Sequence, residues 1–431
     1  GDCIMRVADV KKTVYSADAA AFLDKMYGAG KAQENAERYV MVAEGFAENF
    51  GDREFDFFSS AGRTEIGGNH TDHNHGKVLA GSVQMDCVAA AAPNGTDRVN
   101  IISETYHQTM NIDLNDLAPT HVTTGTVPLV KGVFAGIREK GFQVKGFDVY
   151  LTSNVPGGAG VSSSAAFEML LCSIVDHLFN DHGMDIVTYA KAGQYAENKY
   201  WMKGSGLLDQ MACAVGGIIT IDFMDNDNPV IGKVDCDFSD FGLDLVIVNT
   251  GKSHADLSAE YSSVPNEMKS VAKFFGKEFL SEISEDDVLA NAPAVRKACG
   301  DRSFLRALHF FEENRRVDKE IAALEAGNRS EFLETITASG NSSWKWLQNC
   351  YLNSTPEEQP ITSALAMTEI FLDRLGDGAC RVHGGGFAGV IAAFVPQDHT
   401  REFCEYINKG LGGDYAHIMY IRPQGAVKVT F

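Results

Sequence analysis

Residues 157–164 combine the residue types that bind phosphate groups through the protein backbone. The three glycines of this segment can adopt positive φ and let a ligand approach the main chain closely. Three serines follow at the start of a predicted helix, where unpaired N–H groups attract anions and a hydroxyl can coordinate Mg²⁺. A glycine-rich turn capped by serine is the simplest alternative, and the segment by itself fits both interpretations equally well.

Residues 250–253 form a second candidate, because Thr-Gly-Lys-Ser resembles the end of a P-loop. The motif G-x-x-x-x-G-K-[ST] requires glycine where Val246 stands. Without that glycine the loop cannot wrap a phosphate, so no nucleotide-binding role is predicted here.

A third candidate is the dense group of His70, Asp72, His73 and His75. A metal site is one hypothesis. The spacing is neither that of a helical i, i+4 pair nor that of a metallohydrolase, and the flanking glycines favour a loop. Binding of sugar hydroxyls is the other hypothesis, since carboxylates and neutral histidines make directional hydrogen bonds to hydroxyl groups. The zinc content of the purified protein would separate the two.

These candidates need strands and helices to position them. The first candidate lies between a strand predicted over residues 146–153 and a helix over 162–179. Further strands are predicted within 55–104 and at 217–223, 243–249, 379–383, 389–395, 417–422 and 426–431. Further helices are predicted over 17–49, 185–200, 207–215 and most of 258–375. No sustained βαβ rhythm is present, which favours the α+β class.

A chain of 431 residues exceeds the size at which one hydrophobic core keeps growing, so two domains are expected. The acidic, turn-rich stretch 225–240 is the predicted boundary, which gives domains over residues 1–235 and 236–431.

The formal net charge of −21 argues against nucleic acid or anionic lipid as the main partner, but not against ATP. Nine scattered cysteines without a C-x-x-C pair favour a reducing cytoplasm. We find no secretory signal and no apolar window of about 18 residues, so neither export nor a membrane span is expected.

Four segments in order resemble the motifs of the GHMP small-molecule kinases, and among them the branch that phosphorylates galactose. They are residues 62–76, 156–165, 196–210 (Ala-Glu-Asn and Gly-Leu-Leu-Asp-Gln) and 378–389. The resemblance implies a mixed-sheet N-terminal domain packed with helices, a C-terminal α/β sandwich and an active site in the cleft between them. It also implies ATP-dependent transfer of phosphate to the anomeric hydroxyl of galactose, the first step of galactose catabolism, by a monomer or weak oligomer.

The resemblance assigns roles residue by residue. Asp209 matches the proton acceptor and Arg63 matches the arginine that stabilises the transition state, while Ser164 and Glu197 match the Mg²⁺ ligands. The ATP phosphate loop would comprise Gly158, Ala159, Gly160, Val161, Ser162, Ser163 and Ser164. The sugar site would comprise Asn69, His70, Thr71, Asp72 and Tyr261. A carboxylate beside Arg63 should have a lowered pKa and stay ionised.

Several positions depart from the family pattern. Asn69 stands where the family has Glu, and Glu65 stands where it has Asn. An amide can still bind a hydroxyl, but without the strength of a charge-assisted bond. The family arginine downstream of the sugar-contacting tyrosine is replaced near Val264 and Pro265, and His383 stands in place of Thr or Ser. These departures bear on the identity of the sugar more than on the kinase chemistry.

Two alternatives to a galactose kinase follow. The first is a kinase for another sugar, such as an amino sugar or a uronic acid, although a uronate would need a cation beyond Arg63. The second is a sensor that binds galactose and ATP without catalysis. Loss of the Ser-Ala pair in the phosphate loop marks such sensors, whereas Ser164, Ala165 and Asp209 are all present here.

Overall fold

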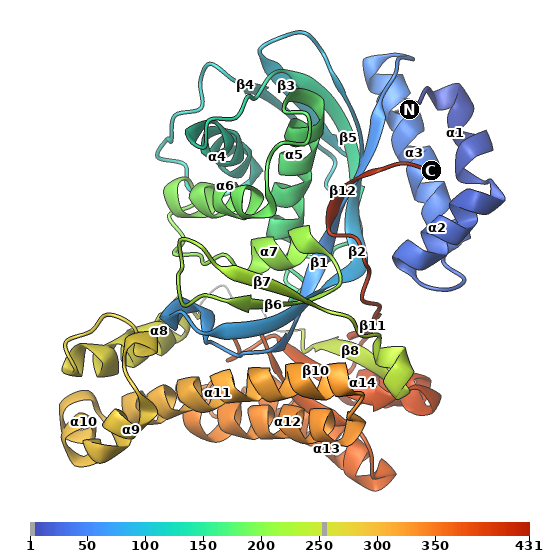
Figure 1. The fold of residues 1–431 in the computed structure, drawn as a ribbon. Helices are drawn as coiled ribbons and strands as arrows, with labels where there is room; N and C mark the ends of the chain where they lie inside the picture. Colours follow the sequence, from blue (N-terminus) through green and yellow to red (C-terminus); the bar gives the residue numbers. More distant parts are fainter. Residues whose placement is uncertain (1–4, 252–256) are drawn as a thin grey trace.

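The computed structural model of the protein describes residues 5–251 and 257–431. Two sheets form its centre (Figure 1). The larger sheet has the order β12 (Ala426–Val429), β1 (Asp56–Gly67), β2 (Lys77–Pro93), β5 (Phe147–Ser153), β3 (Arg98–Ser103) and β4 (Gln108–Asp113). The long strand β2 pairs with β5 along its second half and with β6 (Ile218–Asp222) along its first half, and β7 (Val230–Val234) pairs with β6.

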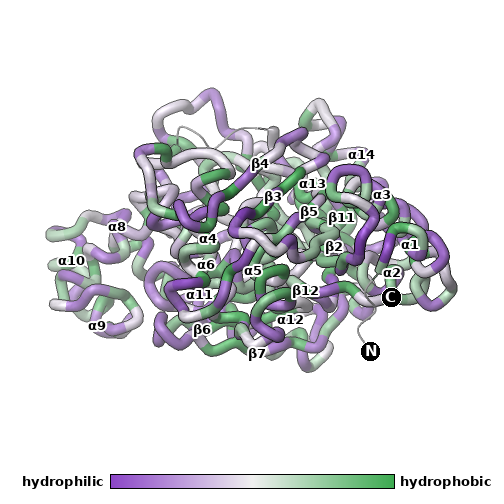
Figure 2. Tube along the Cα trace, turned by 90° about the horizontal axis from the view of Figure 1, so that it is seen from above, coloured by the Kyte–Doolittle hydropathy of each residue, from purple (hydrophilic) through white to green (hydrophobic). Residues whose placement is uncertain are grey.

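Helices cover both faces of the larger sheet. Alternate residues of a strand point to opposite faces. Phe58 and Ala89 accordingly pack in the core with α4 (Thr126–Glu139), α5 (Ser163–Phe179) and α6 (Ile186–Lys199). Phe57 and Ala90 pack against the N-terminal helices α1 (Val7–Val14), α2 (Ala17–Tyr27) and α3 (Ala32–Phe50). In Figure 2, hydrophobic residues gather along α5 and the neighbouring strands, and hydrophilic residues along outer loops.

The smaller sheet is antiparallel and has the order β11 (Ala416–Met419), β8 (Leu243–Asn249), β10 (Val390–Pro396) and β9 (Ala379–His383). Leu245 and Phe394 face α11 (Asp301–Ala326) and α12 (Arg329–Ser342). Val246 and Ile391 face α13 (Pro360–Leu375) and α14 (Thr400–Leu411). The remaining described helices are α7 (Leu208–Val215), α8 (Ser258–Phe274), α9 (Glu285–Ala290) and α10 (Ala292–Cys299).

The chain crosses from the larger sheet to the smaller between β7 and β8, and it returns after β11 to place β12 beside β1. The domain division at residues 235 and 236 stays a prediction. Within the described residues, no helix combines the length and the apolar character needed to cross a membrane.

The mixture of sheets and helices confirms the α+β class, but some elements differ from the predicted ones. The helix predicted over residues 17–49 is broken into α2 and α3, because Gly28 and Gly30 adopt φ of 109° and 78°. The stretch predicted to be turn-rich, 225–240, contains β7.

Helix α4 was not predicted because it contains two glycines, which lower helix propensity. The same glycines let it pack closely on α6. A Cβ at Gly132 would lie 2.7 Å from Ala196 Cα, and one at Gly136 would lie 3.0 Å from Ala192 Cα.

Asp86 of β2 joins the N-terminal helices, the larger sheet and the chain end through buried charges. Its carboxylate accepts hydrogen bonds from Arg38 Nη1 (2.6 Å), Arg422 Nη1 (2.8 Å), Tyr27 Oη (2.6 Å) and Ser59 Oγ (2.6 Å). Burial acts to raise the pKa of Asp86, but the two guanidinium groups outweigh it and hold the pKa below its ordinary value.

We expect Asp86→Asn to lower the free energy of unfolding at pH 7 by about 3–5 kcal/mol, because two buried guanidinium groups lose their countercharge. Since the folded-state pKa is depressed, this stabilisation is present above the unfolded pKa of about 4 and is lost as pH falls further. Urea unfolding at pH 7 and pH 3.5 measures both effects.

The matched control is Arg401→Met, which removes the exposed Arg401–Glu405 ion pair and should leave unfolding unchanged. A loss below about 1 kcal/mol for Asp86→Asn at pH 7 would contradict the assigned role.

Candidate active site

Arg63 connects three of the segments singled out in the sequence. Its Nε donates to Asp209 Oδ1 at 2.8 Å, and its Nη1 donates to the carbonyl oxygen of Gly160 at 2.6 Å. Its backbone N–H also donates to Val161 O at 3.0 Å. Strand β1, the phosphate loop and the first turn of α7 therefore meet at one guanidinium group.

The Arg63–Asp209 pair is asymmetric in exposure, with side chains 10% and 42% exposed. Burial acts to raise the pKa of Asp209, but the charge and hydrogen bond of Arg63 outweigh it and lower the pKa below its ordinary value. Asp209 is therefore ionised, as predicted beside Arg63, and its carboxylate is partly exposed at the surface.

The predicted phosphate loop lies between β5 and α5, as expected. Gly158 and Gly160 adopt φ of 71° and 79°. A Cβ at Gly160 would lie 2.8 Å from Val390 Cγ2, so the loop can approach the smaller sheet only with glycine at this position. Ser162 lies at the helix N-cap with φ of 58°, but its side chain does not cap the helix. The predicted capping is therefore wrong for Ser162, whose hydroxyl instead helps to lower the pKa of Asp209.

A cavity of about 180 Å³ opens beside Ser163 and Ser164. Its other lining residues are mostly apolar and include Tyr106, Leu129, Leu151, Phe167 and Trp201. These residues come from the β3–β4 turn, α4, β5, α5 and the segment after α6, so no local motif gathers them. The available sequence signal was the pair of aromatic residues Tyr106 and Trp201 outside regular elements, and sequence analysis missed it.

Next to the predicted phosphate loop, the carboxylates of Glu168 and Glu197 both accept hydrogen bonds from the side-chain amide of Gln210. Gln210 Nε2 donates to Glu197 Oε2 at 2.5 Å and to Glu168 Oε1 at 3.2 Å. Glu168 follows Ser164 by one helical turn on α5, so the two lie on the same side of that helix. Glu168 Oε2 is buried without a hydrogen-bond partner among the described residues. Burial, and then the charge of Glu197, raise the pKa of Glu168 well above its ordinary value.

The donor set of Ser164, Glu168 and Glu197 fits a divalent metal ion. Hard cations prefer carboxylate and hydroxyl oxygens. Glu168 Oε2 is buried and accepts no hydrogen bond from the described residues, so it is free to bind a cation. Burial also raises the pKa of Glu197, and Lys203 Nζ, 3.5 Å from its Oε1, opposes the rise. Glu168 was not predicted as a site residue.

The predicted sugar loop follows β1 and lies against the segment that carries Asp209. A Cβ at Gly206 would lie 3.3 Å from Asp72 Oδ2. Burial, and then the charge of Asp209, raise the pKa of Asp72 to about 6. His70 Nε2 lies 2.9 Å from Gly385 O and must carry its proton, because a carbonyl oxygen only accepts. Burial lowers the pKa of His70, so this ring is neutral at pH 7.

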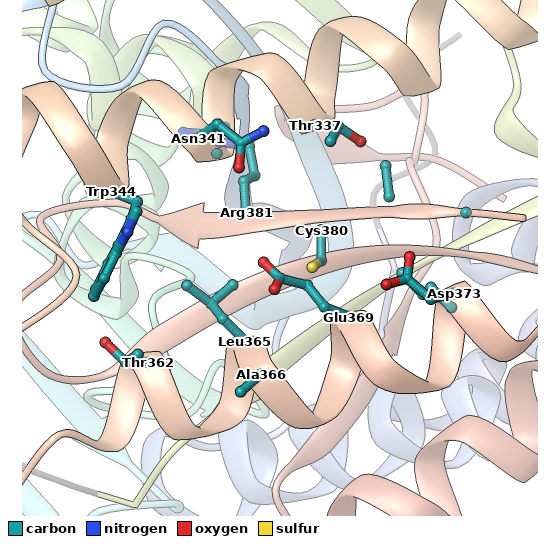
Figure 3. A pocket seen from close by; sticks show the side chains of 14 residues that line it. Thr337, Asn341, Trp344, Thr362, Leu365, Ala366, Glu369, Asp373, Cys380 and Arg381 are labelled. Atoms are coloured by element: carbon teal, nitrogen blue, oxygen red, sulfur yellow. The ribbon is translucent and has the colours of Figure 1, made fainter.

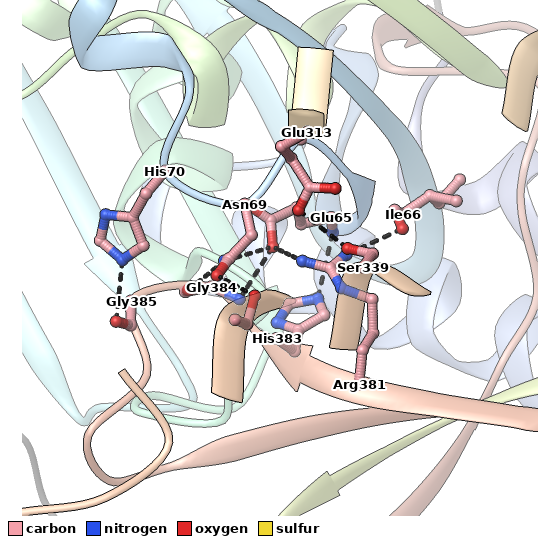
Figure 4. A network of polar contacts seen from close by, with 12 residues as sticks. Glu65, Ile66, Asn69, His70, Glu313, Ser339, Arg381, His383, Gly384 and Gly385 are labelled. Atoms are coloured by element: carbon pink, nitrogen blue, oxygen red, sulfur yellow. Dashed lines mark hydrogen bonds and ion pairs between the residues drawn. The ribbon is translucent and has the colours of Figure 1, made fainter. Parts of the chain in front are cut away.

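The polar groups of Asn69 (Figure 4) and of Thr71 are occupied by hydrogen bonds within the protein. Asn69 Oδ1 accepts from Ser343 Oγ and Asn349 Nδ2, at 3.1 and 3.0 Å. Asn69 Nδ2 donates to Gly384 O at 2.7 Å and to Glu65 Oε2 at 3.3 Å. Thr71 Oγ1 lies 2.5 Å from Lys77 O. Both residues therefore fix the loop in place.

Tyr261 of α8 approaches from the side of the smaller sheet. Its hydroxyl donates to Gly386 O at 3.2 Å, and its ring packs edge-on against Phe387. A Cβ at Gly385 would lie 2.5 Å from the Tyr261 ring, so Tyr261 lies directly on the glycine turn that His70 contacts.

The histidine-rich segment does not gather metal ligands. Among the described residues, the group with ligand atoms close enough for one ion is Asp176, His177 and His182, at the end of α5. In the second phosphate-loop candidate, Val246 lies buried in β8, and Lys252 and Ser253 lie outside the described residues.

A further cavity, of about 480 Å³, lies between α12, α13 and β9 (Figure 3). Glu369, Asp373 and Trp344 line it. It contains none of the predicted catalytic, sugar-binding or phosphate-loop residues, so it is separate from the candidate active site.

Two family models match the chain. The galactokinase galactose-binding signature matches residues 44–93, and the GHMP kinase N-terminal domain matches residues 128–217. Galactokinase of Lactococcus lactis subsp. lactis is 29% identical over 395 residues, which cover 90% of this chain and 94% of that protein. Galactokinase of Limosilactobacillus reuteri is 27% identical over 362 residues, which cover 82% of this chain and 89% of that protein.

Solved structures agree with these matches. The crystal structure of Lactococcus lactis galactokinase complexed with galactose superposes with a TM-score of 0.76 and 26% identity, covering 90% of this chain and 98% of that one. Mevalonate kinase from Methanococcus jannaschii has a TM-score of 0.59 and 15% identity, covering 85% and 98%, and shows the shared fold.

The fold and the match to the GHMP kinase N-terminal domain make the chain similar to the GHMP kinases, which are phosphotransferases of small molecules. Within this family it resembles the galactokinases, whose signature matches the segment that contains Arg63 and the sugar loop. The resemblance inferred from the sequence is confirmed.

We expect Asp72 to titrate near pH 6, and we expect Asp209→Asn to lower its pKa because the neighbouring negative charge is removed. Carboxyl ¹³C NMR of the two proteins measures the change directly. Asp225→Asn, at an exposed turn, is the matched control and should leave Asp72 unaffected. An Asp72 pKa near 4 in the unmodified protein would contradict this environment.

Proposed function

We propose that the protein transfers the γ-phosphate of ATP to the anomeric hydroxyl of galactose and releases galactose 1-phosphate and ADP. The Arg63–Asp209 pair carries the proposal, because it places a cation and an ionised carboxylate at the phosphate loop. The match of residues 44–93 to the galactose-binding signature supports galactose as the sugar.

In the proposed reaction, Asp209 accepts a hydrogen bond from the anomeric hydroxyl and orients its oxygen toward the γ-phosphate. Its lowered pKa makes it a weak base, so it receives the proton late, after the oxygen has begun to bond to phosphorus. Arg63 stabilises the negative charge on the transferred phosphoryl group. Phosphoryl transfer depends mainly on positioning and charge stabilisation, and these two residues provide both.

ATP would bind with its phosphates on the backbone N–H groups of residues 158–164 and its base in the cavity between Tyr106 and Trp201. Ser164 and Glu197 would hold Mg²⁺, with Glu168 close behind. The ion would supply positive charge that neutralises the phosphate oxygens during transfer.

For the sugar, we propose that Asp72, His70 and Tyr261 lie around the hydroxyl groups, and that Asn69 and Thr71 hold the loop that presents them. A uronic acid is less favoured, because Asp72 and Asp209 would face its carboxylate. A non-catalytic sensor is less favoured, because Ser164 and Asp209 are both present.

A reducing cytoplasm and a monomer or weak oligomer remain our proposals for the setting of this reaction. All eight described cysteines are free thiols, which suits a reducing compartment.

We expect Asp209→Ala to lower kcat for galactose phosphorylation by at least about 10³-fold, because the hydroxyl loses both its orientation and its proton acceptor. Calorimetry should still show ATP binding with Mg²⁺, since the phosphate loop is unchanged. Asp225→Ala is the surface control and should keep full turnover. Turnover of Asp209→Ala within tenfold of the unmodified enzyme would refute the catalytic assignment.

We expect Trp201→Ala to raise KM for ATP by about 5- to 100-fold, the range for loss of one aromatic ring stacked on a base. KM for galactose should stay within about twofold, because none of the proposed sugar-binding residues lines the cavity. Steady-state kinetics with each substrate varied separately give both constants. An effect confined to galactose would exclude this cavity as the base site.

A further inference from the structure

Glu65 is a buried carboxylate to which the reaction described above gives no role. It follows Arg63 by two residues on β1, and the pairing with β2 is regular between them (Arg63 with Ser82, Glu65 with Ala80). Residues two apart on a regular strand point to the same face. Glu65 therefore points to the side of the sheet where Arg63 meets Asp209.

One oxygen of Glu65 holds the carboxylate in place (Figure 4). Glu65 Oε2 accepts from Arg381 Nη2 at 2.8 Å, from the backbone N–H of Gly384 at 3.0 Å and from Asn69 Nδ2 at 3.3 Å. Three donors on one oxygen fix the orientation of the whole group.

The other oxygen, Glu65 Oε1, has no hydrogen-bond partner among the described residues. This oxygen is not fully buried. It therefore contributes to the 5% of the Glu65 side chain that is exposed. A carboxylate oxygen held rigid, unpaired and accessible is a ready acceptor for a ligand hydroxyl.

The charge of Glu65 acts on the proposed site itself. It contributes to the raised pKa of Asp72, where burial is the largest cause, and it opposes the lowering of the pKa of His70 by burial. It also helps to raise the pKa of Arg63 against burial. The charge of Glu65 thus acts on three residues of the proposed site.

We propose that Glu65 Oε1 accepts a hydrogen bond from one hydroxyl of the bound sugar, which makes Glu65 a specificity-determining residue. Relative to the family motif, the carboxylate has moved from position 69 to position 65, and Asn69 has become the positioning residue that holds it. This proposal rests on the proposed function.

The presence of the carboxylate at position 65 instead of position 69 indicates which class of sugar the site would accept. Glu65, Asp72 and Asp209 together offer acceptors to a neutral sugar with free hydroxyl groups and repel a carboxylated sugar. Replacing the hydroxyl that Glu65 contacts by hydrogen leaves a buried charge unpaired, so the enzyme should discriminate strongly at that carbon.

The experiment combines the variant Glu65→Gln with galactose and its 2-, 3-, 4- and 6-deoxy analogues. For galactose, we expect kcat/KM to fall about 10- to 100-fold through KM for the sugar, because a charge-assisted hydrogen bond is lost, while KM for ATP stays within about threefold. For one deoxy analogue, the variant and the unmodified enzyme should have kcat/KM within about threefold of each other, because that analogue lacks the hydroxyl that Glu65 binds.

Glu313→Gln is the matched control. Glu313 is equally buried, and its charge also acts on Arg381, but it bonds to Arg316 and Ser339. It should lower kcat/KM by the same factor for every analogue. An equal loss across all analogues for Glu65→Gln would overturn the proposal and reduce Glu65 to a structural role.

A second pair of variants covers the case in which Glu65→Gln does not fold, which ADP binding by calorimetry would reveal. Asn69→Glu alone places two carboxylates about 3 Å apart and should lose activity. The double variant Glu65→Asn/Asn69→Glu restores the family arrangement and should recover kcat/KM for galactose to within about tenfold. A double variant no better than Asn69→Glu would overturn the proposal. Absence of galactose phosphorylation by the unmodified protein would instead overturn the proposed function.

Discussion

The structure of the site depends on the guanidinium group of Arg63. A buried guanidinium is stable only when its N–H groups find acceptors and its charge finds a partner. Asp209 and the carbonyl oxygen of Gly160 satisfy Arg63 from α7 and from the phosphate loop. The same contacts bring the proposed base and the proposed phosphate-binding backbone to one place, so folding and the proposed catalysis would rely on one set of bonds.

A second set of bonds fixes the sugar loop against the smaller sheet. His383 of β9 lies 3.0 Å from both the backbone N–H of Glu65 and Thr64 Oγ1, through its Nε2. Because the N–H donates, Nε2 is the acceptor, and burial keeps the pKa of His383 well below its ordinary value. A neutral ring therefore serves where the family usually has a hydroxyl residue, and Arg381 beside it neutralises Glu65.

The sequence was sufficient where a motif is local. The glycine–serine loop, Arg63 and the short segment around Asp209 each carry their own pattern, and α5 and β5 follow from periodicity. The base cavity and Glu168 could not be predicted, because their residues meet only after several elements pack together. The role of Asn69 could not be predicted either. Its place in the motif indicates a sugar contact, but its side chain makes four hydrogen bonds within the protein. Three of them are to residues more than 270 positions away along the chain, and the fourth is to Glu65.

The acidity of the site follows from the chemistry that it must perform. Sugar hydroxyls are bound best by carboxylates, yet ATP brings further negative charge. The structure balances the negative charge differently in the two parts of the proposed site. On the sugar side, Arg63 pairs with Asp209 and Arg381 pairs with Glu65. On the phosphate side, Glu168 and Glu197 are crowded, and their raised pKa values indicate that the carboxylates there lack sufficient countercharge. In the proposed reaction, a divalent ion arriving with ATP would supply that charge, and the acidic protein would bind the anionic nucleotide through the cation that accompanies it.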